Sequence, residues 1–131
     1  MSELGFFEGK VLVVEDDEDS QIIADYILGS LQLDFEIAEN GIKALELIKK
    51  NEKYYDVIFM DIAMPGKSGI EVTKEIRNLE GNENKNTLII ALTAMSSEYI
   101  EKECTDVGFD GVLSKPFAKD MVVGIINEKF K

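Results

Sequence analysis

The chain alternates between short apolar runs and longer segments in which apolar residues recur at helical spacing. Three runs are wholly apolar, at residues 11–14, 57–60 and 88–92. A continuous apolar run of four to eight residues is typical of a strand that is buried on both faces. Residues 34–38 alternate polar and apolar side chains, and residues 111–114 form a shorter run before Lys-Pro. We therefore expect five strands, the second of which has one polar face.

Each expected strand is followed by a segment with helical periodicity. We expect helices over about 19–30, from Asn40-Gly41, after Ser68-Gly69, after Ser96 or Ser97, and over about 118–130. Loops are expected at residues 51–55 and 80–86. The predicted inward-facing residues, helix by helix, are Ile22, Ile23, Tyr26 and Ile27; Ala44, Leu45 and Ile48; Ile70, Thr73, Ile76 and Leu79; Ile100, Cys104 and Val107; and Met121, Val122, Ile125 and Ile126.

A strand and a helix thus alternate five times without a break in composition. Right-handed crossovers then give an α/β fold with a five-stranded parallel sheet and helices on both faces. The three wholly apolar strands must be central, and the strand at 34–38 suits an edge. This predicts the order 2-1-3-4-5, with the chain reversing between the first and third strands. We expect one domain over residues 1–131, with 1–8 as an N-terminal extension and no output domain.

Composition narrows the classes of function. The chain has 131 residues, with 26 acidic against 14 basic residues and a net charge of −12, which disfavours direct nucleic-acid binding. No apolar run approaches the ~20 residues that cross a bilayer, so we expect no membrane insertion and a cytoplasmic location. Histidine is absent, which excludes a histidine base, nucleophile or metal ligand in this chain. The single cysteine, Cys104, excludes an internal disulfide and is expected to be a buried core residue.

Polar side chains follow four of the expected strands where each strand ends. Glu15 and Asp16 follow the first, Asp61 ends the third, Thr93 ends the fourth and Lys115 follows the fifth. An isolated acid at a strand end is adequately explained as a cap of the next loop. An acid pair, a lone acid, a hydroxyl and an ammonium at the carboxyl edge of one sheet indicate a functional site.

The chemistry that needs these groups is phosphoryl transfer to a carboxylate. Asp16 and Asp61 can supply carboxylate ligands to Mg²⁺, with Glu15 acting through a metal-bound water. The Lys115 ammonium and the Thr93 hydroxyl can bind phosphoryl oxygens. The backbone N–H of Ala94 is a further candidate for phosphate binding.

Four segments together resemble the response-regulator receiver domain of two-component signalling. They are VLVVEDDE, VIFMDIAMPGKSG, LIIALTA and GVLSKPF, they occur in the family's order, and they span nearly the whole chain from about residue 9. The resemblance implies a flavodoxin-like, doubly wound fold and a phosphorelay protein rather than a turnover enzyme. It implies that Asp61 is the phosphoacceptor and that the backbone carbonyl of Ala63 is a metal ligand. The other residues matching the family's site are Glu15, Asp16, Thr93 and Lys115.

The resemblance also implies a cis peptide bond between Lys115 and Pro116 and a phosphohistidine donor. Because this chain has no histidine, the donor must be a histidine kinase or histidine phosphotransfer domain in trans. The pattern LTA-M-S…SKPF is similar to receivers of hybrid sensor kinases. A downstream protein partner is not identified by the sequence.

Three positions depart from the pattern of many receivers. Val112 lies where many receivers carry an aromatic switch residue, so a muted conformational change is expected. Ala63 and Met95 lie two residues after the acceptor and the threonine, and neither side chain can orient an attacking water. We therefore expect an aspartyl phosphate that hydrolyses slowly for this family.

Two other functions remain open at this point. A haloacid-dehalogenase-like phosphatase also uses a strand-end aspartate and Mg²⁺, but it requires a second aspartate at the position of Ala63. A phosphorylation-independent interaction module usually lacks the acid pair, the acceptor or the lysine, all of which this chain retains.

Overall fold

The computed structural model describes residues 7–50 and 54–130 and contains one parallel sheet of five strands in the order β2-β1-β3-β4-β5. The predicted α/β class, strand order and edge position of the second strand are confirmed. The strands are β1 (Lys10–Val14), β2 (Asp34–Ala38), β3 (Val57–Asp61), β4 (Leu88–Thr93) and β5 (Gly111–Ser114). The helices are α1 (Glu18–Ser30), α2 (Gly41–Lys49), α3 (Gly69–Arg77), α4 (Glu98–Val107) and α5 (Lys119–Lys129), with a short 3₁₀ helix, η1 (Glu83–Asn86).

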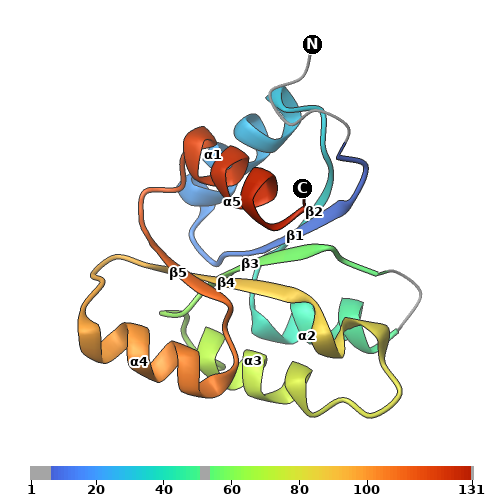
Figure 1. The fold of residues 1–131 in the computed structure, drawn as a ribbon, viewed down its shortest axis with the longest axis vertical. Helices are drawn as coiled ribbons and strands as arrows, with labels where there is room; N and C mark the ends of the chain where they lie inside the picture. The colour runs from blue at the N-terminus through green and yellow to red at the C-terminus, as the bar shows by residue number, and fades with distance from the viewer. Residues whose placement is uncertain (1–6, 51–53, 131) are drawn as a thin grey trace.

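The sheet lies between two helical layers, with α1 and α5 on one face and α2, α3 and α4 on the other (Figure 1). Successive side chains of the central strands therefore enter two different cores. In β3, Val57 and Phe59 pack on the side of α1 and α5, while Ile58 and Met60 pack on the side of α2, α3 and α4. This explains why the central strands read as unbroken apolar runs.

Parallel register brings the carboxyl ends of the strands to one edge. Val14 of β1 pairs with Met60 of β3, and Asp61 pairs with Leu92 of β4. Successive strands are added to the sheet first on one side of β1 and then on the other, because β2 pairs with one edge of β1 and β3 with the opposite edge. Residues that follow β1 and β3 therefore lie beside each other at the switch point of the sheet.

Most predicted inward-facing residues contribute to these cores. All three predicted inward-facing residues of α2 are buried, namely Ala44, Leu45 and Ile48. In the other helices, the predicted inward-facing residues that are buried are Ile27, Thr73, Ile76, Cys104, Val122 and Ile126. Asn40, Ser68 and Ser97 cap the starts of α2, α3 and α4 through their side chains. Of the predicted loop 51–55, residues 51–53 lie outside the described part of the chain.

The predicted inward face of α1 is wrong for three of its four residues. Ile22, Ile23 and Tyr26 are 67%, 44% and 76% exposed. The buried residues of α1 are Ala24, Ile27 and Leu28. The apolar side chains of α1 itself lie on more than one side of the helix, so periodicity alone could not decide which side faces the sheet.

The segment 80–86, expected to be only a polar loop, contains η1 and the fully buried Asn84. The Asn84 side-chain oxygen accepts hydrogen bonds from the Tyr55 backbone N–H at 2.8 Å and the Thr87 hydroxyl at 3.3 Å. These bonds satisfy polar groups that would otherwise be buried without partners. Sequence composition indicated a solvated loop because it does not reveal which asparagine turns inward.

Arg77, the last residue of α3, joins three segments at the amino edge of the sheet. Its guanidinium donates to the backbone carbonyls of Gly108, Lys85 and Thr87 at 2.7–2.9 Å. It also pairs with Asp110 at 3.0 Å. Burial lowers the pKa of Arg77, and Asp110 opposes that effect. The side chain therefore ties α3 to the segments that precede β4 and β5.

Within the described residues, none of the helices combines the length and apolar character that crossing a membrane would require.

Candidate functional site

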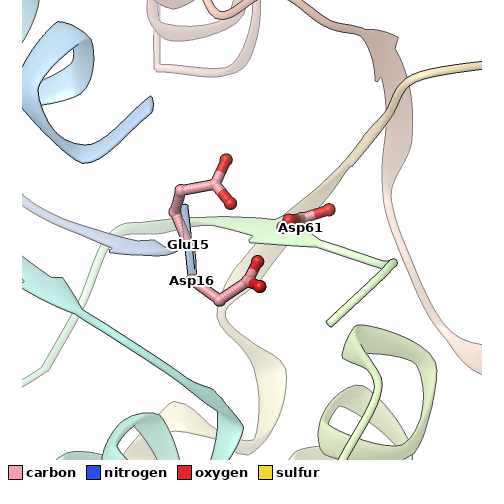
Figure 2. A group of neighbouring side chains, drawn as sticks. All are labelled: Glu15, Asp16 and Asp61. Carbon is pink, nitrogen blue, oxygen red and sulfur yellow. The ribbon is translucent and has the colours of Figure 1, made fainter. Parts of the chain in front are cut away.

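Three carboxylates meet at the carboxyl edge of the sheet. Glu15 and Asp16 follow β1 and Asp61 ends β3, and Figure 2 shows the side chains of the acid pair extending on the side where Asp61 lies. Ligand oxygens of the three residues lie within 4.8 Å of one another. Glu15 and Asp61 are only 2% and 3% exposed, whereas Asp16 is half-buried. The fold thus places acids from two separate strands around one small volume.

The Lys115 ammonium lies against the buried members of this cluster. Its Nζ is 2.7 Å from Glu15 Oε1 and 3.1 Å from Asp61 Oδ2. The Lys115–Pro116 peptide bond is cis, as the sequence resemblance implied. The Lys115 backbone N–H donates to the Thr93 carbonyl at 2.7 Å, so the end of β4 anchors the segment that carries the lysine.

Burial and charge act together on the ionisation of these groups. Burial, and then the adjacent Glu15 carboxylate, raise the pKa of Asp61 to about 7, against the opposing effect of Lys115. Burial also penalises the ionised form of Glu15, but hydrogen bonds with Asp61 and Lys115 outweigh it and lower the pKa of Glu15. For Lys115, the two carboxylates outweigh burial and raise its pKa.

The backbone around Asp61 is held closely. The Ala63 N–H donates to Asp61 Oδ1 at 3.1 Å, and the Gly69 N–H donates to the Ile62 carbonyl at 3.2 Å. A Cβ atom on Gly69 would lie 2.3 Å from the Asp61 carbonyl oxygen, closer than any side chain can approach. Glycine therefore lets the start of α3 pack directly on the acceptor loop. The sequence prediction treated Gly69 only as part of a helix start.

The Thr93 hydroxyl interacts locally with Met95 in this structure. Its Oγ1 donates to the Met95 carbonyl at 3.1 Å and accepts from the Met95 N–H at 3.3 Å. Thr93 itself is buried, whereas the Met95 side chain is 81% exposed. The hydroxyl therefore has to exchange these backbone partners before it can bind another group.

Ala94 lines a cleft of about 250 Å³ beside the acid cluster, together with Glu15, Lys115 and Ile23 of α1. The cleft connects the buried Glu15 carboxylate with the exposed Ile23 on α1. The structure thus brings all seven sequence-predicted site residues to this edge of the sheet: Glu15, Asp16, Asp61, Ala63, Thr93, Ala94 and Lys115.

The donor set fits a hard divalent cation. Three carboxylates that converge from two strands supply oxygen ligands, which Mg²⁺ prefers over nitrogen or sulfur. Ala63 belongs to the loop that follows Asp61, directly beside the carboxylate cluster. The arrangement can therefore hold a cation beside a carboxylate, that of Asp61, which also contacts the Lys115 ammonium.

A side chain of α1 that is not among the predicted site residues also contacts the site. Gln21 of α1 donates from its side-chain amide to the backbone carbonyl of Glu15 at 2.7 Å. A lone glutamine in an amphipathic helix carries no recognisable motif, so only the folded arrangement could reveal this contact.

Comparison with known proteins is consistent with this geometry. The sequence profile of the response regulator receiver domain matches residues 11–127. The chemotaxis protein CheY of Halobacterium salinarum is 34% identical over 122 residues, which cover 91% of this chain and 94% of that protein. The hybrid signal transduction histidine kinase A of Dictyostelium discoideum is 36% identical over 111 residues, which cover 84% of this chain. The chain spans about 5% of that kinase's length.

Solved structures show the same similarity. The receiver domain of the sensor histidine kinase PA1611 of Pseudomonas aeruginosa, which has a magnesium ion coordinated in its active-site cleft, is 30% identical with a TM-score of 0.79. The alignment covers 93% of this chain and 97% of that one. The receiver domain of Saccharomyces cerevisiae Ssk1, crystallised with the histidine phosphotransfer protein Ypd1, matches at 30% identity and a TM-score of 0.81. That match covers 92% of this chain and 88% of the solved one.

Proposed function

This chain belongs to the response-regulator receiver domain family of two-component signalling, and from that premise we propose that Asp61 accepts a phosphoryl group from a phosphohistidine on a partner protein. The observation that carries the proposal is the convergence of Glu15, Asp16 and Asp61 with the Lys115 ammonium at one sheet edge. This set supplies a nucleophile, metal ligands and a cation for the phosphoryl oxygens. On this proposal the chain acts as a phosphoacceptor and not as a turnover enzyme.

The transfer follows from the positions of these groups. A carboxylate oxygen of Asp61 attacks the phosphorus, the P–N bond of the phosphohistidine breaks, and its electron pair returns to the imidazole. Mg²⁺, when bound, neutralises charge on the phosphoryl oxygens and on the attacking carboxylate. Asp16, Asp61 and the Ala63 carbonyl would hold the ion directly, with Glu15 acting through water.

Lys115 and Thr93 act on the phosphoryl oxygens. The Lys115 ammonium, shared between Glu15 and Asp61 in this structure, lies 3.1 Å from Asp61 Oδ2 and can therefore reach a phosphoryl group on that carboxylate. The Thr93 hydroxyl and the Ala94 N–H bind remaining oxygens once the hydroxyl leaves its Met95 partners. Val112 is a half-buried aliphatic residue that packs on the core, so we propose that this rearrangement moves the α4–β5–α5 surface only slightly.

The exposed apolar residues of α1 form the docking surface for the phosphohistidine donor. Ile22, Ile23 and Tyr26 lie together on the outer face of α1, and Ile23 also lines the cleft that contains Glu15 and Lys115. An exposed apolar patch continuous with a reactive site is typical of a protein-interaction surface. The Ssk1 receiver, which resembles this chain, binds a histidine phosphotransfer protein. A histidine kinase or a histidine phosphotransfer domain is therefore the partner we propose.

The test measures Mg²⁺-dependent incorporation of phosphate from acetyl phosphate and from a panel of phosphorylated histidine phosphotransfer domains. We expect incorporation by the wild-type protein and by Asp106→Asn, an identical chemical change at an exposed residue of α4. Asp61→Asn should abolish it with both kinds of donor. Incorporation that survives Asp61→Asn would refute the assignment of the acceptor.

The same assay separates docking from chemistry. The double variant Ile22→Ser, Tyr26→Ser should slow transfer from the protein donor at least tenfold, because it removes apolar contact area, while acetyl phosphate reacts unchanged. Equal slowing with both donors would contradict the docking surface. Turnover of a phosphomonoester would instead support a phosphatase, for which Ala63 provides no general acid. A folded protein that accepts no phosphate would support a phosphorylation-independent module.

A further inference from the structure

Gln21 makes a contact with the metal-site acids that no recognised motif assigns. Its side chain is half-buried, and its Nε2 donates to the backbone carbonyl oxygen of Glu15 at 2.7 Å. Only the NH₂ end of the amide can donate to a carbonyl, so this contact fixes the orientation of the Gln21 side chain. The bond joins α1 to the end of β1.

The carbonyl that Gln21 holds belongs to the peptide group between Glu15 and Asp16. A peptide group is planar, so fixing its orientation restricts the backbone directions of both acids at once. On the other side of Glu15, the backbone N–H donates to the Ala38 carbonyl at 3.0 Å. The acid pair is therefore held from β2 on one side and from α1 on the other.

The position of this peptide matters for a cation that requires nearly octahedral geometry. The ligand oxygens of Glu15, Asp16 and Asp61 already lie within 4.8 Å of one another, and a rotation of the shared peptide would move two of the three carboxylates. We propose that Gln21 is a positioning residue of the magnesium site, which orients the Glu15–Asp16 peptide for metal binding. This inference rests on the proposed function, which identifies the bound ion as Mg²⁺.

Two substitutions separate positioning from charge. Gln21→Met keeps the size of the side chain and its helix propensity but removes the donor. Gln21→Glu keeps the shape, removes the donor, and adds a negative charge that by itself would attract Mg²⁺. Ser30→Ala is the matched control, because it deletes the other hydrogen bond from an α1 side chain to a backbone carbonyl, that of Ser30 to Ile27 at 2.8 Å. It acts at the far end of the helix.

Mg²⁺ binding by isothermal titration calorimetry is the first readout. Groups that orient metal ligands typically change affinity 10–100-fold when mutated, so we expect binding about tenfold weaker in both Gln21 variants and unchanged in Ser30→Ala. The second readout, without Mg²⁺, is NMR. The Glu15 carbonyl carbon should shift in both Gln21 variants and remain in place in Ser30→Ala.

Wild-type affinity in Gln21→Met, tighter binding in Gln21→Glu, or an unchanged Glu15 carbonyl signal would each overturn the inference while leaving the proposed function intact. A wild-type protein that binds no Mg²⁺ would overturn both. Weaker binding by both variants, together with the carbonyl shift, supports the positioning role. A structural role limited to helix packing would lower stability without this change in affinity.

Discussion

Replacing Asp61 with asparagine is expected to stabilise the Mg²⁺-free protein at alkaline pH. Asp61 is 3% exposed and lies beside Glu15. Burial, and then Glu15, raise the pKa of Asp61 from 3.8 to about 7, so the folded protein disfavours the ionised carboxylate that the site needs. Asparagine has nearly the same shape and carries no charge.

The size of the effect follows from the two pKa values. A separation of about three pH units corresponds to about 4 kcal/mol between the ionised and protonated forms. The NH₂ group of asparagine cannot accept the hydrogen bond that Lys115 donates to Asp61 Oδ2 at 3.1 Å, which removes part of this gain. We therefore expect Asp61→Asn to raise the free energy of unfolding by about 2–4 kcal/mol at pH 8.

The pH dependence has a definite sign. The folded-state pKa lies above the unfolded one, so the folded state binds the proton more tightly between about pH 4 and pH 7. The contribution of Asp61 to wild-type stability is therefore present below pH 4 and is lost as the pH rises through about 7. The advantage of Asp61→Asn should consequently be less than half of its full size at pH 5, where the folded protein still holds the proton, and nearly complete at pH 8.

Urea denaturation followed by far-ultraviolet circular dichroism, in EDTA at pH 5 and pH 8, measures this difference. Asp106→Asn, an exposed control, should stay within about 0.5 kcal/mol of wild type at both pH values. Addition of Mg²⁺ should stabilise the wild-type protein and not Asp61→Asn. A variant that is less stable than wild type at pH 8, or equally stabilised at both pH values, would refute the reasoning.

Three further outcomes are expected. Thr73→Val should raise the free energy of unfolding by about 1–2 kcal/mol in urea titrations, because the Thr73 hydroxyl is fully buried and has no hydrogen-bond partner among the residues that the structure describes. A destabilised variant would mean that the hydroxyl is satisfied. Arg77→Met should lower the free energy of unfolding by about 2–4 kcal/mol, because three partly buried carbonyls lose their donor. Mg²⁺ affinity, measured calorimetrically, should stay unchanged, because the site lies at the opposite edge of the sheet. The double variant Ala63→Asn, Met95→Glu should shorten the lifetime of the aspartyl phosphate in Mg²⁺ by providing polar groups that orient water; an unchanged lifetime would contradict that role.

The polar residues that end the strands predicted which side chains lie together at one edge of the sheet. The reason is the parallel sheet, which forces all carboxyl ends to one edge and thus brings Glu15, Asp61 and Lys115 together. Each residue's distance from its neighbours could not be predicted, since it depends on register and on the path after Lys115. The raised pKa of Asp61 likewise follows from burial between two strands and not from its sequence neighbours.

The sequence by itself determined the five strands, their order and the chemical types at the switch point, because these depend on local periodicity and on the rules of parallel connection. The tertiary structure decided which side of α1 faces the sheet, and it left Ile22 and Tyr26 exposed beside the site. It also decided that Asn84 turns inward and that Gln21 reaches the Glu15 carbonyl. Contacts of this kind join segments that are set side by side only by packing, and no periodic pattern records them.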